Sequence, residues 1–150
     1  SHYPLLCSCA TKNCTGVNAT LLPLFSLFND YRYDMYLGAH THIYERQYPY
    51  YKGAVMSVEG PYHNIDSMVS IAEGVAGNEK DIVETAYPLK SYTAKATFNE
   101  TGFGILTVWN QTHLQYQHFS TKGGTHVADN VLMTKYQSVQ RSLRTYLMDE

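Results

Sequence analysis

The 150-residue sequence is poor in charged side chains, and the charges it has are nearly balanced. Charged residues make up 16% of the chain, with 11 basic against 13 acidic, and the formal net charge is −2. A typical soluble domain carries about 25% charged residues. Neither sign is concentrated in one segment, so the sequence lacks the electrostatic footprint of a protein that binds nucleic acid or an anionic membrane. We therefore expect neither partner.

Long apolar runs are also absent. A membrane-spanning helix needs about 20 consecutive apolar residues, and the best candidate, residues 21–28, is interrupted by Pro23 and Ser26. The chain begins at Ser1 with neither an initiator methionine nor the charged-then-apolar pattern of a signal peptide. We expect a soluble segment that is a fragment of a longer protein.

Motifs of covalent catalysis are missing as well. There is no Gly-x-Ser-x-Gly string, which marks one class of serine nucleophile. The acidic residues Asp66, Glu73, Glu79 and Asp81 include no closely paired carboxylates of the kind that general acid and base catalysis needs. The chemistry of this chain must therefore come from other residue types.

Cysteine is scarce, but its three copies are close together at Cys7, Cys9 and Cys14. In a secreted protein an odd count implies one bridge with a leftover thiol, or a partner cysteine outside the segment. We favour a bridge between Cys7 and Cys14. Asn-x-Ser/Thr triplets, the acceptor pattern for N-glycans, are more frequent than chance predicts and occur at Asn13, Asn18, Asn99 and Asn110. Cysteines and triplets together predict a secretory route.

Apolar periodicity predicts one helix near the start of the chain. Apolar side chains recur at i, i+3, i+4 and i+7 from Leu21 to Phe28, Thr20 is the expected cap, and Pro23 falls in the first turn, where proline is tolerated. We expect this helix to end near Tyr33. Before it, residues 3–8 are typical of a strand end, and residues 8–20 of a surface loop.

Short apolar runs predict several strands after the helix, at residues 35–39, 54–58, 68–72, 92–98, 103–108, 113–119 and 131–135. Residues 40–46 are expected to be a loop, 109–112 a hairpin loop, 74–78 a turn, and 137–150 either a short helix or a frayed tail. A helix and strand followed by hairpins favours a mixed α and β layered architecture. Such folds place ligand sites in loops at the ends of strands.

The sharpest local feature is the string from Gly38 to Arg46, Gly-Ala-His-Thr-His-Ile-Tyr-Glu-Arg, in which His40 and His42 follow a predicted strand. Neutral imidazole is the commonest side-chain ligand for metals. In an extended chain alternate residues share a face, so one spacer residue lets both rings point into one cavity. Alone, the pair is more typical of two polar residues on an exposed loop than of a metal site.

Further strings, in the same order along the chain, strengthen the metal interpretation. They are His2-Tyr3-Pro4-Leu5-Leu6-Cys7-Ser8, Cys14-Thr15, His40 to Arg46 with Pro49 and Tyr51, Ala76-Gly77-Asn78-Glu79, Phe103-Gly104, and Asn110-Gln111-Thr112-His113-Leu114. From His2 to about Lys135 the chain resembles the C-terminal part of purple acid phosphatases, enzymes of the calcineurin-like metallophosphoesterase superfamily. The resemblance implies an α/β fold, part of a layered β-sandwich flanked by helices, with the N-terminal half missing. Residues 1–136 would belong to the catalytic domain and 137–150 to a C-terminal tail.

The resemblance also implies a binuclear metal centre, with Fe(III) and a divalent Zn, Mn or Fe ion. Matched residue by residue, His2 and His40 would bind the divalent ion and His42 the ferric ion. The other four ligands of the family, two Asp, a Tyr and an Asn, have no equivalent string here and are expected upstream. The implied activity is hydrolysis of phosphate monoesters at acidic pH, in a secreted or lysosomal or vacuolar protein, with the proton donor unassigned.

Several residues and two other functions have competing interpretations. Glu45 and Arg46 either orient the histidine rings or form an ordinary ion pair. We expect Tyr44 to have a packing role. Structural roles are expected for the other histidines, His63, His113, His118 and His126, and the segment around His63 is the one that could reach the rim of the cleft. One alternative is a non-catalytic secreted glycoprotein that keeps the fold without the metals. The other is a different two-metal phosphodiesterase or nucleotidase, which would not be expected to combine the Tyr-Glu-Arg string with the closing Asn-x-Thr-His-Leu hairpin.

Overall fold

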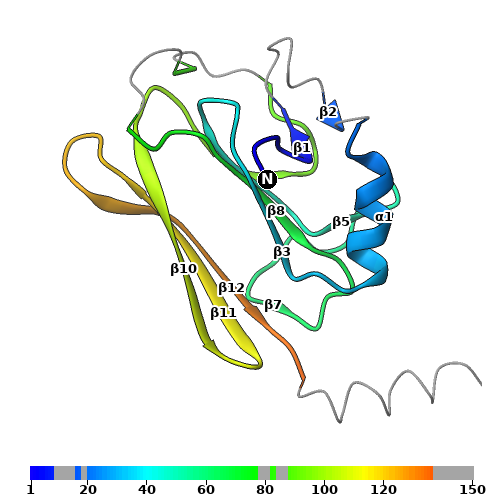
Figure 1. The fold of residues 1–150 in the computed structure, drawn as a ribbon. Helices are drawn as coiled ribbons and strands as arrows, with labels where there is room; N and C mark the ends of the chain where they lie inside the picture. Colours follow the sequence, from blue (N-terminus) through cyan, green and yellow to red (C-terminus); the bar gives the residue numbers. More distant parts are fainter. Residues whose placement is uncertain (9–15, 18–19, 78–81, 84–87, 137–150) are drawn as a thin grey trace, which may run out of the picture.

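The computed structural model describes residues 1–8, 16–17, 20–77, 82–83 and 88–136. Within them, one helix and two four-stranded sheets lie in three layers (Figure 1). The first sheet has the order β3 (Met35–Gly38), β8 (Val69–Glu73), β4 (Tyr44–Gln47) and β9 (Thr93–Thr97). The second has the order β10 (Gly102–Asn110), β11 (His113–Ser120), β12 (His126–Thr134) and β7 (Tyr62–His63). Two short pairs complete the described strands, β1 (Leu6–Cys7) with β2 (Gly16–Val17) and β5 (Tyr50–Tyr51) with β6 (Ala54–Val55).

The helix α1 (Leu22–Asp30) covers the face of the first sheet that points away from the second sheet (Figure 1). Its buried Phe25 packs in one cluster with Leu5, Leu6, Met68 and Tyr92. Burial of this apolar stripe, rather than helix propensity, is what stabilises so short a helix. The predicted mixed α and β layers are confirmed.

The predicted ends of the helix were wrong. The N-cap is Leu21, which makes no side-chain capping bond, and not Thr20. Pro23 does lie in the first turn, as predicted. The helix ends at Asp30 because the chain turns left-handed at Arg32, with φ 55°, and the amide of Tyr33 donates to the carbonyl of Phe28 at 2.9 Å. Such a closing bond satisfies a carbonyl at the helix end and stops the helix before Tyr33.

The space between the two sheets holds an apolar core with a polar strip through it. Val69, Ile71, Val131 and Met133 pack there with buried tyrosines. The ring of Tyr44 stacks on that of His118 with centroids 3.9 Å apart. His118, whose side chain is 0% exposed, also contacts Glu73 through Nδ1 at 3.0 Å. These contacts confirm the packing role of Tyr44 and the structural role of His118.

Most predicted strands were confirmed, and four described strands were missed. The runs at 35–39, 68–72, 92–98, 103–108, 113–119 and 131–135 correspond to β3, β8, β9, β10, β11 and β12. Only the first two residues of the predicted strand 54–58 form a strand, β6. The predicted hairpin loop 109–112 is shorter in the structure, because β10 continues to Asn110. The missed strands are β2, β4, β5 and β7, of which β2 lies in the predicted loop 8–20 and β4 begins in the predicted loop 40–46. β4 has the polar sequence Tyr-Glu-Arg-Gln, and it forms a strand because partners far along the chain pair with its polar side chains.

The strand β10 is at the edge of the second sheet (Figure 1). Its exposed apolar side chains are Phe103, Ile105, Leu106, Val108 and Trp109, with Val108 68% and Trp109 64% exposed. Because successive residues of a strand point to opposite faces, these side chains lie on both faces of β10. Among the described residues, no helix is long and apolar enough to cross a membrane. The segment 137–150, the Cys9 and Cys14 thiols, and the motif residues Asn78 and Glu79 lie outside the described residues.

Candidate metal centre

His2 lies beside the end of β3 because main-chain hydrogen bonds hold its segment there. The Ser1 amino group donates to the carbonyl of Leu37 at 3.0 Å, and the Ala39 amide donates to the carbonyl of His2 at 2.9 Å. Gly38 allows this close approach, since a Cβ at that position would lie only 2.7 Å from the Tyr3 carbonyl oxygen. The segment that carries His2 and the strand that precedes His40 are therefore packed backbone against backbone.

The rings of His2 and His40 meet although 38 residues separate them. Nδ1 of His40 lies 2.8 Å from Nε2 of His2, and the ring centroids are 4.7 Å apart at an interplanar angle of 77°. His40 adopts a left-handed backbone with φ 62°. That conformation costs a non-glycine residue about 1–2 kcal/mol. Contacts around His40 offset this cost and hold the residue just after the end of β3.

His42 follows in a tight turn that rests on Gly74. The Thr41 amide donates to the Ala39 carbonyl at 2.7 Å, and the Ile43 amide to the Thr41 carbonyl at 2.8 Å. A Cβ on Gly74 would lie 1.8 Å from the Thr41 carbonyl oxygen, so only glycine lets the end of β8 touch this turn. The half-buried His42 is close enough to His40 to influence its protonation.

The protonation of His40 is biased toward the neutral ring. Desolvation lowers the pKa of His40 below its ordinary 6.5, and the nearby His2 and His42 rings lower that pKa further. The neighbouring rings act in this direction because a second positive charge beside a protonated imidazole is unfavourable. Since the neutral imidazole is the form that binds metals, the cluster keeps His40 available as a ligand.

The pair fits a divalent ion in donor type and spacing. Metal–nitrogen bonds of about 2.0–2.1 Å at angles of about 90–110° separate two ligand nitrogens by about 2.8–3.4 Å. The observed 2.8 Å is at the lower end of this range. Between the histidines, Thr41 Oγ1 is buried and makes no hydrogen bond within the described part of the chain. In those residues no group of three or more His, Cys, Asp and Glu side chains is arranged to hold a metal ion. The two rings can contribute to a site, but further ligands must complete it.

Comparisons with known proteins find similar sequences and a similar fold. Residues 67–130 match a family model described as iron/zinc purple acid phosphatase-like protein C. The chain is 32% identical over 145 residues to acid phosphatase type 7 of Homo sapiens and 33% identical over 149 residues to that of Danio rerio, covering 89% of this chain in each case. Its fold matches a purple acid phosphatase from yellow lupin, Lupinus luteus, with a TM-score of 0.76 over 90% of this chain and 24% of that one, at 19% identity.

The chain belongs to the purple acid phosphatase-like family of metallophosphoesterases. It spans about a third of the two curated relatives, 33% of each. Membership in this family implies a centre of two metal ions, typically iron with a second metal. The predicted family and fold class are thereby confirmed, whereas the assignment of individual ligands stays a prediction.

In this purple acid phosphatase-like chain Glu45 anchors the segment that carries His2. Its carboxylate accepts hydrogen bonds from the Ser8 amide at 2.9 Å, the Ser8 hydroxyl at 2.7 Å and the Thr93 hydroxyl at 2.8 Å. Glu45 is 0% exposed, so these hydroxyl and amide donors are what make its burial tolerable. Within the described residues the Glu45 carboxylate bonds to Ser8 and Thr93, and these bonds orient the segment behind His2 rather than a histidine ring.

Arg46 forms an ordinary ion pair, one of the two roles that the sequence left open for it, and its partner is Asp129. Its Nε lies 2.7 Å from Asp129 Oδ2 and its NH2 group 3.1 Å from Oδ1, while Tyr44 donates to Oδ2 at 2.7 Å. Burial alone would raise the pKa of Asp129, but the hydrogen bonds and charge of Arg46 and the bond from Tyr44 outweigh it and lower that pKa. The pair ties β4 to β12 across the two sheets.

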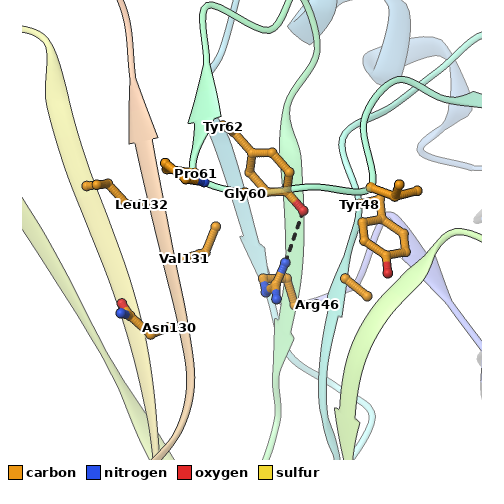
Figure 2. A pocket seen from close by; sticks show the side chains of 10 residues that line it. Arg46, Tyr48, Gly60, Pro61, Tyr62, Asn130, Val131 and Leu132 are labelled. Carbon is orange, nitrogen blue, oxygen red and sulfur yellow. Dashed lines mark hydrogen bonds between the residues drawn. The ribbon is translucent and has the colours of Figure 1, made fainter.

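A cleft of about 450 Å³ lies beside this pair. Arg46, Tyr48 and Tyr62 face it from one side and Val131 and Leu132 line it from β12 (Figure 2), and Arg46 NH1 reaches the Tyr62 hydroxyl at 3.3 Å. None of its lining residues is a histidine. The cleft is therefore separate from the candidate metal centre.

The remaining histidines have local partners, as expected for structural roles. His63 contacts Thr134 at 2.6 Å, His113 contacts Thr112 at 2.8 Å, and His126 contacts the Gly124 carbonyl at 2.9 Å. Tyr3 also lies at the centre, with its ring against both His2 and His40. The resemblance to the family, in which Arg or Ser is common at this position, led us to expect an effect of Tyr3 on the substrate rim. Its contact with the two rings was not expected, because it depends on how the two segments fold together.

Proposed function

We propose that this chain is the C-terminal part of a metal-dependent acid phosphatase that hydrolyses phosphate monoesters, with His2, His40 and His42 as metal ligands. The observation that supports this best is the 2.8 Å approach of the His2 and His40 ring nitrogens from segments 38 residues apart. Two exposed histidines of no function would have no reason to be brought together at the cost of a left-handed backbone at His40.

In this proposal His2 and His40 bind the divalent ion, which is Zn, Mn or Fe, and His42 binds Fe(III). Imidazole suits such ions, while the harder oxygen ligands that Fe(III) prefers would come from other parts of the full-length protein. When bound, two such ions supply the charge that neutralises phosphate oxygens and lowers the pKa of water for in-line attack. The chain's own contribution is to hold the imidazole rings on rigid supports.

The rigid supports are specific contacts. Gly38 and Gly74 let main chain pack directly against the Tyr3 carbonyl and the His40–His42 turn, and Glu45 fixes the segment behind His2. Metal ligands need such outer contacts to keep their orientation. A phosphate ester would bind where the rings of His2 and His40 converge.

The test uses the full-length protein with His40→Ala and His42→Ala variants and His126→Ala as the matched control, since exposed His126 lies in the second sheet. We expect the first two to lose bound metal, measured by elemental mass spectrometry, and to lose hydrolysis of phenyl phosphate at acidic pH. The control should keep both. Full metal content in all three variants would overturn the ligand assignment, and a folded, metal-free wild type without hydrolysis would favour the non-catalytic glycoprotein.

We also propose that the protein follows the secretory route to a secreted, lysosomal or vacuolar destination, with a Cys7–Cys14 bridge. Asn99, at a bend after β9, and Asn110, the last residue of β10, are both exposed, which makes them accessible to glycans. Asn13, Asn18 and Cys14 lie outside the described residues. Removal of N-glycans by glycosidase should lower the apparent mass of the native protein, and an unchanged mass would contradict the route.

A further inference from the structure

The ring of Tyr3 lies against both candidate ligands and still faces solvent. Its centroid is 4.5 Å from that of His40, with a tilt of 51°, and 5.0 Å from that of His2 in an edge-on arrangement. Tyr3 is nevertheless 47% exposed. A large aromatic side chain with so much free surface, placed directly beside a pair of imidazoles, forms part of the wall around the site.

The main chain of Tyr3 is held firmly, so the ring is presented from a fixed base. The Tyr36 hydroxyl donates to the Tyr3 carbonyl at 2.7 Å. Gly38 packs under the same carbonyl, where a Cβ would be 2.7 Å away, and the following Pro4 is buried. A side chain that is already ordered loses little conformational entropy when a ligand packs against it.

The chemistry of a neutral phenol ring decides what Tyr3 can recognise. It carries no charge with which to attract a phosphate group, which the imidazoles and metals would hold. Its free surface can instead stack on, or meet edge-on, a second planar ring, and such aromatic pairs are stabilised beyond simple burial of apolar area. A saturated group of equal size gains only the apolar contact.

We propose that Tyr3 is a specificity-determining residue that favours phosphate monoesters with an aromatic leaving group. This inference rests on the proposed phosphatase function. The phosphoryl group binds beside His2 and His40, and the aryl group of the ester lies against the exposed part of the Tyr3 ring. Hydrolysis then breaks the bond between phosphorus and the phenolic oxygen, water supplies the new oxygen on phosphorus, and the leaving oxygen takes up a proton.

The experiment compares phenyl phosphate with cyclohexyl phosphate, which are similar in size but differ in planarity, on the full-length metal-loaded protein. Dividing each variant's ratio of kcat/KM values by the wild-type ratio removes the intrinsic difference in reactivity between the two esters. The variants are Tyr3→Phe, Tyr3→Leu and Tyr3→Ala, with Tyr31→Ala as the matched control, because Tyr31 is a 72% exposed tyrosine at the end of α1.

We expect Tyr3→Leu and Tyr3→Ala to lower the phenyl-to-cyclohexyl ratio about 3- to 10-fold, the range that one aromatic pair gives. Tyr3→Phe and Tyr31→Ala should keep it, and inhibition by inorganic phosphate should not change. If Tyr3→Ala fails to fold, Tyr3→Leu decides, since it keeps the bulk and removes the planarity. Equal ratios in wild type and Tyr3→Leu would overturn the proposal.

A binding measurement separates this inference from the proposed function. Calorimetric titration with phenylphosphonate and methylphosphonate requires no turnover. Tyr3→Leu should weaken phenylphosphonate binding about 3- to 10-fold relative to methylphosphonate. If the wild-type protein binds both phosphonates but hydrolyses neither phenyl phosphate nor cyclohexyl phosphate, the phosphatase proposal is refuted. If Tyr3→Leu keeps the wild-type preference for phenylphosphonate over methylphosphonate, the role of Tyr3 is refuted.

Discussion

Replacing Gly74 with alanine should disturb the turn that joins His40 and His42. A Cβ at residue 74 would lie 1.8 Å from the Thr41 carbonyl oxygen, whereas ordinary contacts begin at 3.4 Å. The turn or the end of β8 must therefore move by about 1.6 Å, and the atom in the way belongs to the main chain, which cannot rotate aside. Displacements of about 1 Å at a reacting centre can cost about 100-fold in rate.

From this displacement we expect Gly74→Ala to weaken metal binding about 10- to 100-fold, comparable to the loss of a contact that orients a ligand. The free energy of unfolding should fall by about 1–3 kcal/mol, as for other overpacked sites. Zinc titration of the metal-free full-length protein and urea denaturation measure the two effects. The matched control is Gly60→Ala, because a Cβ there meets nothing within 4 Å.

Unchanged zinc affinity and stability in Gly74→Ala would refute this reasoning, because they would mean that the turn yields freely. Loss of stability with unchanged zinc affinity would refute only the link to the histidines. Weakened binding in the Gly60→Ala control would show that alanine substitution as such disturbs the protein, and the distance to Thr41 would then explain nothing.

Three further predictions concern the buried carboxylates. Asp129→Asn should lower the free energy of unfolding by about 3 kcal/mol, measured by urea denaturation, because it leaves the largely buried Arg46 without a counter-charge. The pKa of the Asp129 carboxyl in the folded protein is below its usual 3.8. The carboxylate therefore contributes its full stabilisation above pH 3.8, and this stabilisation is lost as the pH falls through the lower pKa of the folded state. Urea denaturation midpoints should consequently fall less at acidic pH in Asp129→Asn than in wild type. Glu45→Gln should cost about 1–3 kcal/mol, since an amide cannot accept all the bonds from Ser8 and Thr93, and an unchanged melting temperature would contradict this.

Apolar periodicity predicted the helix and most strands because those elements bury apolar faces. It failed at β4, where Glu45 and Arg46 occupy a central strand. A lone sequence window cannot show that Ser8, Thr93 and Asp129 supply partners for these charges, because Asp129 lies 83 residues from Arg46. Tertiary contacts of this kind override local propensity.

The candidate metal centre was also predictable only in part, because local spacing is visible in a sequence and contacts between distant segments are not. The spacing of His40 and His42 at the end of a strand was visible in the sequence, whereas the place of His2 beside them came from the resemblance to a family. The structure adds the contact of ring nitrogens at 2.8 Å. The roles of Gly38 and Gly74 could not be predicted, because each depends on a close approach between two segments of backbone.

The exposed edge strand β10 affects how this segment behaves when it is handled alone. Its unpaired backbone groups and its apolar side chains from Phe103 to Trp109 form a template on which another extended chain can add. Preparations of the 150-residue segment should therefore associate as concentration rises, visible as increased light scattering. A lysine at Val108, the most exposed of these apolar residues, would be the natural solubilising substitution for crystallisation or NMR.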